Sequence, residues 1–79
     1  MVTVHRADGL RIVIFVDDHE PSHVHVFGDG EAKINLLGAD GAPELIWAVG
    51  MTRAELRRAL RIVKEHQTNL LKRWSEIHG

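Results

Sequence analysis

The stretch that decides the fold is HVHVFGDGEAKINL, residues 23–36, in which polar and apolar side chains alternate on both sides of a short glycine-containing segment. Such alternation is typical of two half-buried β-strands, because successive side chains of a strand point to opposite faces. The segment 28–30 between the two runs predicts the turn of a β-hairpin. We therefore expect the fold to be built around an antiparallel strand pair at 23–27 and 31–36.

The register of this hairpin follows from the separation of apolar and polar side chains. A three-residue turn at 28–30 pairs Val26 with Ala32 and His25 with Lys33, so that one face is apolar and the other polar, as a half-buried sheet requires. A two-residue turn would mix both kinds of side chain on each face. We predict the three-residue turn, with Gly30 in the left-handed backbone conformation.

Three more segments, 2–6, 10–16 and 44–49, are short and rich in β-branched or other apolar residues, which predicts further strands. Thr52 followed by Glu55 has the spacing of a helix-capping box, and neither glycine nor proline occurs from there to Ile77. The predicted fold is α+β: a small antiparallel sheet of four to five strands with one long C-terminal helix packed on one face. All of it forms a single domain, 1–79, with the sheet in 1–49 and the helix in 52–77.

The length of that helix suggests a surface for a partner. An unbroken helix would be ~37 Å long, whereas a compact chain of this size has a radius of gyration of only ~12 Å. Its last turns would then extend beyond the sheet and expose Leu70, Leu71 and Trp74, and Phe15 lies on a sheet face that one helix cannot cover. Such apolar surface predicts a protein partner or a homodimer. Alternatively, a break near 67–69, where weaker helix formers occur, would fold the end back.

Composition narrows the possible classes of protein. The absence of cysteine excludes disulfides and thiolate metal ligands, and no stretch approaches the ~20 apolar residues of a membrane span, so we expect a cytoplasmic protein without membrane contact.

Residues 1–52 hold eight acids against three bases, and residues 53–79 hold seven bases against three acids. Along one flank of the predicted helix lie four bases that either hold an RNA backbone or are simply solvated: Arg53, Arg57, Arg61 and Lys64.

The strongest concentration of reactive side chains is in residues 17–25, which hold three acids and three histidines around one proline. His23 and His25 share a strand face ~6–7 Å apart, and His19, Asp17 or Asp18 can supply a further ligand to the same ion. These donors suit zinc, iron, nickel or manganese. The residues therefore predict a candidate metal site, although polar side chains on an open sheet face would give the same pattern.

A metal-free catalytic site is the other chemical hypothesis. His23 and His25 could serve as general base and general acid in RNA cleavage by an internal 2′-hydroxyl, with Lys33 stabilising the charge on phosphorus. The residues alone do not decide between this RNase-type chemistry, a metal-dependent hydrolase and a metal-binding module without catalysis.

The string DHEPSHVHV at 18–26, the segment GEAK at 30–33 and the helix segment ELRRALRIVKEH at 55–66 resemble a bacterial family known as domain of unknown function four-one-six-zero. The resemblance spans nearly the whole chain, and this chain has Ser22 where the family usually has a second proline. It implies a small intracellular protein with a sheet and a helix, encoded in a toxin–antitoxin-like operon, and it implies no reaction. We therefore expect a partner-binding toxin-like or regulatory component of a two-protein module, with the hydrolase and the metal-binding module as alternatives.

Overall fold

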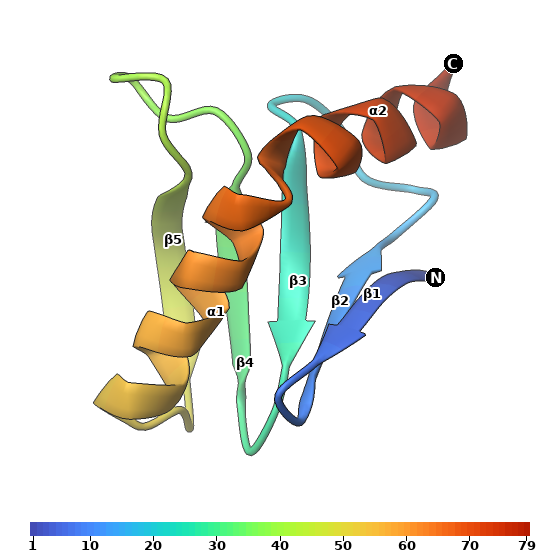
Figure 1. Ribbon diagram of the computed structural model, residues 1–79. Coiled ribbons are helices and arrows are strands. Elements are labelled where there is room, and N and C mark those ends of the chain that lie inside the picture. The colour runs from blue at the N-terminus through green and yellow to red at the C-terminus, as the bar shows by residue number, and fades with distance from the viewer.

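The computed structural model describes all of residues 1–79, and its architecture is a five-stranded sheet with two helices (Figure 1). The strands are β1 (Val2–Ala7), β2 (Leu10–Ile14), β3 (His23–Phe27), β4 (Glu31–Asn35) and β5 (Glu44–Val49). Each strand pairs antiparallel with the next, in the order β1-β2-β3-β4-β5. The predicted α+β class and antiparallel sheet are confirmed.

The core lies between the sheet and the two helices, α1 (Arg53–Glu65) and α2 (Gln67–His78). Figure 1 shows α1 crossing the face of β4 and β5, while α2 lies across the end of the sheet where β3 begins. Alternate residues of β2, β3 and β4 supply the sheet's share of the core, since the side chains that face the helices recur at every second position. That share consists of Leu10, Ile12, Ile14, Val24, Val26, Ala32 and Ile34, with Leu36 directly after β4.

The hairpin of β3 and β4 has the predicted register. Val26 pairs with Ala32, His25 pairs with Lys33, and Phe27 with Glu31 closes a loop of three residues. The predicted left-handed conformation of Gly30 is wrong, because positive φ angles occur at other glycines and not at this one. A glycine is needed there for a different reason: a Cβ atom would lie 2.0 Å from the carbonyl oxygen of Val49.

The prediction of one unbroken helix is also wrong, and the alternative of a break that folds the end back is the one observed. The chain turns at His66 (φ −107°, ψ 14°), one residue before the segment named in that alternative. The Gln67 side-chain amide donates hydrogen bonds to the carbonyl oxygens of Leu36 (2.6 Å) and Gly41 (2.9 Å). The turn returns α2 to the sheet. As a result the longest extent of the molecule is 34 Å, less than the ~37 Å of one unbroken helix.

The start of α1 follows the predicted capping box only in part. The Thr52 hydroxyl accepts a hydrogen bond from the backbone N–H of Glu55, as an N-cap does. The Glu55 carboxylate does not reach back to Thr52; it is buried and accepts the backbone N–H of Asp29 at 3.1 Å. This contact fixes the first turn of α1 against the hairpin turn, where Gly28 leaves room for the carboxylate.

Candidate metal centre

Strand β3 places two histidines on the sheet face that α1 does not cover. Val24 and Val26 point into the core, so His23 and His25 point the other way, and their ring centroids lie 5.4 Å apart. The side chains of both histidines are largely enclosed, 5% exposed for His23 and 12% for His25. Neither ring is therefore an ordinary solvated side chain on an open sheet.

The loop between β2 and β3 brings a carboxylate to these rings. Asp18 lies in a turn in which its backbone N–H donates to the carbonyl oxygen of Phe15 at 3.1 Å. Its side-chain oxygen Oδ2 reaches Nε2 of His23 at 2.9 Å and Nε2 of His25 at 3.7 Å. One ligand atom from each of the three residues lies within 4.8 Å of the others, which is compatible with ligation of a single ion.

The other nitrogen of each ring has its own partner. Nδ1 of His23 lies 2.9 Å from the carbonyl oxygen of Pro21, and Nδ1 of His25 lies 3.0 Å from Oε2 of Glu31. Carbonyl and carboxylate oxygens only accept hydrogen bonds, so Nδ1 is the protonated nitrogen of both rings. In a neutral ring Nε2 then carries the lone pair, and both lone pairs belong to the atoms that surround Asp18.

Asp18 Oδ2 lacks a conventional partner in this arrangement. The atom is buried and makes no hydrogen bond, although Nε2 of His23 lies 2.9 Å away. A carboxylate oxygen and two nitrogen lone pairs do not stabilise one another. A proton on a ring or a cation among the three atoms must therefore compensate them.

Helix α2 holds the loop that carries Asp18. The Trp74 indole N–H donates to Oε1 of Glu20 at 3.1 Å, and Nε2 of His78 lies 3.2 Å from the carbonyl oxygen of Phe15. Trp74 also packs beside His23, with ring centroids 5.1 Å apart. The C-terminal helix thus forms part of the wall around the site.

The site is open on the side of the loop. A hollow of about 590 Å³ lies beside Asp18 and is lined by Val16, Asp17, Asp18, His19, Glu20, Trp74 and His78. On the sheet side, aromatic rings flank His25: Phe15 at 4.7 Å and Trp47 at 6.0 Å between centroids. Of the three donor residues, Asp18 alone lines the hollow.

The structure does not bring all the predicted site residues together. Of the predicted metal ligands, Asp18, His23 and His25 converge, whereas His19 is exposed in the loop and is not in the cluster. Lys33, predicted to act with the two histidines in RNA cleavage, pairs with His25 across the hairpin.

The predicted partner and RNA residues lie elsewhere. Leu70 and Trp74 are buried in the chain's own core, Leu71 packs against that core, and Phe15 is half-buried. The overhang that motivated the first three therefore does not exist. The four bases predicted to hold RNA lie on α1, and one of them, Arg61, is within 4 Å of both Asp8 and Glu65; the others are Arg53, Arg57 and Lys64.

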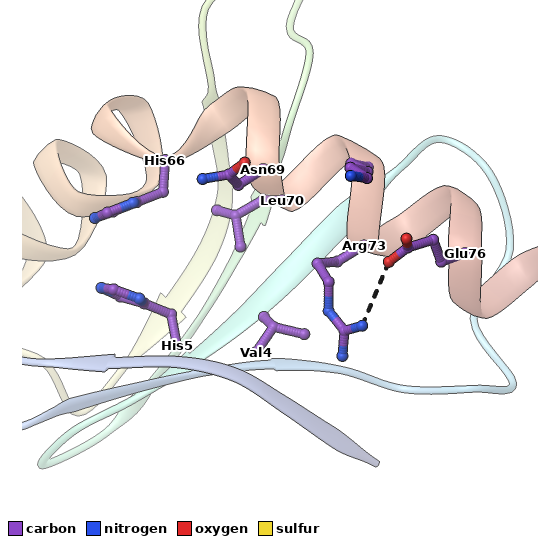
Figure 2. A pocket seen from close by; sticks show the side chains of 8 residues that line it. Val4, His5, His66, Asn69, Leu70, Arg73 and Glu76 are labelled. Atoms are coloured by element: carbon purple, nitrogen blue, oxygen red, sulfur yellow. Dashed lines mark hydrogen bonds and ion pairs between the residues drawn. The ribbon is translucent and has the colours of Figure 1, made fainter.

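A second hollow, of about 300 Å³, lies between β1 and α2 (Figure 2). His5 of β1 and His66 at the helix break lie there side by side, with ring centroids 4.2 Å apart and ring planes tilted by 40°. Arg73 points into the same hollow and lies 3.4 Å from Glu76. No third metal-binding side chain joins the two histidines, so this cluster lacks the donor set found at Asp18.

Sequence reasoning missed the residues that surround the three donors. Glu31 could have been found, because the predicted register places it two positions from Lys33, the partner of His25. The contacts of Glu20 with Trp74 and of Pro21 with His23 depend on the conformation of the loop, which the residue pattern does not predict. His78 and Trp74 reach the site only because α2 folds back, which the predicted single helix did not allow.

Comparison with known proteins places the chain in a family. Residues 9–75, which include the three donors and most of both helices, match domain of unknown function DUF4160. The chain belongs to that family, and the resemblance expected from residues 18–26, 30–33 and 55–66 is confirmed. No curated protein and no solved structure matches the chain. Neither helix is long and apolar enough to cross a membrane.

Proposed function

We propose that the protein binds one divalent metal ion through Oδ2 of Asp18, Nε2 of His23 and Nε2 of His25. The observation that carries the proposal is the convergence of these three atoms within 4.8 Å while both Nδ1 atoms are engaged elsewhere. Histidines that bind metal characteristically donate their second ring N–H to a carbonyl or a carboxylate, which fixes the ring and its tautomer. Pro21 and Glu31 supply those two acceptors.

The donor set also indicates what kind of centre this is. Two imidazoles and one carboxylate are ligands of zinc and of other first-row divalent ions. Closed structural zinc sites use four protein ligands, whereas three protein ligands leave a position for water or a substrate. The hollow lined by the loop and α2 lies on the Asp18 side of these ligands. With three protein ligands, the centre resembles the site of a metal-dependent hydrolase more closely than a structural metal site.

Metal-free RNA cleavage has less support from the geometry. General acid–base chemistry needs the reacting nitrogens to face a substrate. Here both Nε2 atoms face Asp18 and both Nδ1 atoms face other acceptors. Both imidazoles are thus oriented towards the Asp18 carboxylate, and we favour the metal-binding function.

The role of a partner-binding component in a two-protein module is the second candidate function. It no longer depends on Leu70 and Trp74, which are buried in the core. The observation in its favour is a different apolar surface on β5, where Ile46, Trp47 and Val49 are exposed.

Zinc competition titration of protein purified without a histidine tag tests the metal proposal. We expect one zinc ion per chain, with affinity reduced at least about tenfold in Asp18→Asn and in His25→Gln, since each removes one ligand. His19→Gln is the matched control, because it removes an exposed histidine of the same loop, and it should bind zinc like the wild type. No stoichiometric binding, or equal affinity in Asp18→Asn and the wild type, would refute the proposal.

A further inference from the structure

An irregularity of strand β1 turns His5 towards the hollow beneath α2. Thr3 pairs with Val13, which lies on the open face of the sheet. His5, two residues further on, pairs with Ile12 of the core face, because the register shifts between Thr3 and His5. Without this shift both side chains would lie on the open face. Irregularities of this kind re-aim a side chain and are frequent beside functional sites.

The break between the helices places a second imidazole beside the first. His66 is the residue at which α1 ends and α2 begins, and its ring centroid lies 4.2 Å from that of His5. The hydrogen bonds of histidine rings in this chain are made by His23, His25 and His78. The ring nitrogens of His5 and His66 therefore have no hydrogen-bond partner within the chain and are available to a ligand.

The other side of the hollow is cationic. Arg73 points into it from α2, across from the two imidazoles, and Lys72 lines it as well (Figure 2). Glu76 is the one acid of the lining, and it accepts a hydrogen bond from a single nitrogen of Arg73 at 3.4 Å. A guanidinium group has five N–H donors, so most of them remain available. Two apolar side chains, Val4 and Leu70, complete the lining.

The groups around the hollow fit an anion with several oxygens. Guanidinium and ammonium groups only donate hydrogen bonds, and an imidazole donates through one ring nitrogen when neutral and through both when protonated. A phosphate monoester carries about −1.5 to −2 charges at neutral pH and has three strong acceptor oxygens. The volume of about 300 Å³ is at the small end of the range for ligand pockets, which suits a small molecule.

We propose that this hollow binds a phosphate group, of a small phosphate monoester or of free inorganic phosphate, through His5, His66, Lys72 and Arg73. The two imidazoles donate to the phosphate oxygens from one side, and the guanidinium and the ammonium group compensate its charge from the other. A metal ion is disfavoured at the two histidines, because Lys72 and Arg73 repel a cation.

This site is separate from the metal centre. The hollow beside Asp18 and the hollow beneath α2 have no lining residue in common. The metal donors lie on the open face of the sheet and on the loop before β3, whereas His5 and His66 lie on the side of the helices. Loss of zinc binding and loss of phosphate binding can therefore be observed separately.

Titration of the full chain with sodium phosphate, followed by NMR of the histidine rings in zinc-free buffer at constant ionic strength, tests the proposal. We expect saturable shifts of the His5 and His66 ring signals with a dissociation constant of about 1 mM or lower, and no shift of His19. Arg73→Gln should weaken binding at least about fivefold, because it removes a charged donor. Glu76→Gln should strengthen binding, since it removes the acid that competes for Arg73.

Arg57→Gln is the matched control, because it removes an exposed arginine of α1 outside the hollow, and it should bind phosphate like the wild type. Circular dichroism confirms that each variant is folded, and Arg73→Gln should keep the wild-type affinity for zinc. The absence of a saturable response of His5 and His66 overturns the proposal. Equal phosphate affinity of Arg73→Gln and the wild type also overturns it.

The same titration with adenosine 5′-monophosphate and with adenosine distinguishes the two sources of the phosphate group. Tighter binding of the monophosphate than of inorganic phosphate identifies a phosphate monoester as the ligand, and equal or weaker binding identifies the free ion. Adenosine that binds as tightly as its monophosphate would overturn the proposal, because recognition would then not involve the phosphate.

Discussion

Individual atoms around β3 decide what the two histidines can do. The carbonyl oxygen of Pro21 and the carboxylate of Glu31 each hold an Nδ1–H, so the tautomer of both rings is set by the fold. Because the remaining nitrogens meet at Asp18, a proton and a metal ion compete for the same place. Zinc affinity should therefore fall as pH falls, since acid favours the protonated rings over the neutral ones that bind metal.

Close packing of the backbone explains why residue 30 is a glycine. We predict that Gly30→Ala lowers the free energy of unfolding by about 1–3 kcal/mol, since a Cβ atom at 2.0 Å from the Val49 carbonyl oxygen forces the backbone to move. Asp29→Ala, an exposed position in the same turn, should change it by less than about 0.5 kcal/mol. Urea unfolding of both variants provides the measurement, and equal midpoints would show that the approach of β5 to this turn is not tight.

The elements differ in how far the sequence predicts them. The register of β3 and β4 was predictable because a shift of one residue would move Val24 and Val26 out of the core. The proximity of Asp18 to the histidines was predictable in outline, because all three lie in one short segment. A break near His66 was predictable only as an alternative, from the weaker helix formers at 67–69. The contacts that stabilise it run from Gln67 to Leu36 and Gly41, far away in the sequence, and no local pattern predicts them.

Helix α2 is the element on which the shape of the site depends most. We predict that Trp74→Phe, which keeps most of the ring but removes the N–H that binds Glu20, lowers the free energy of unfolding by about 1–3 kcal/mol. It should also weaken zinc binding, because the loop that carries Asp18 loses an anchor. Glu76→Ala, an exposed change on the same helix, is the control for thermal melting and zinc titration. Unchanged zinc affinity in a destabilised Trp74→Phe protein would mean that α2 supports the fold and not the site.

At the scale of the whole molecule, acidic and basic residues lie in different parts of the fold, and the three donor atoms lie in the acidic part. The acid-rich part, 1–52, forms the sheet and supplies all three donor atoms, and the base-rich part, 53–79, forms the two helices. Only α2 reaches the donors' surroundings, through Trp74 and His78.

The central claim is that Nε2 of His23 and Nε2 of His25 bind one divalent ion together with Asp18. The most direct measurement is nitrogen NMR of the histidine rings at neutral pH, before and after addition of one equivalent of zinc. We expect the Nε2 resonances of His23 and His25 to shift together while both Nδ1 atoms stay protonated, with His19 and His78 unaffected. Rings that do not respond to zinc, or that respond through Nδ1, would contradict the metal centre described here.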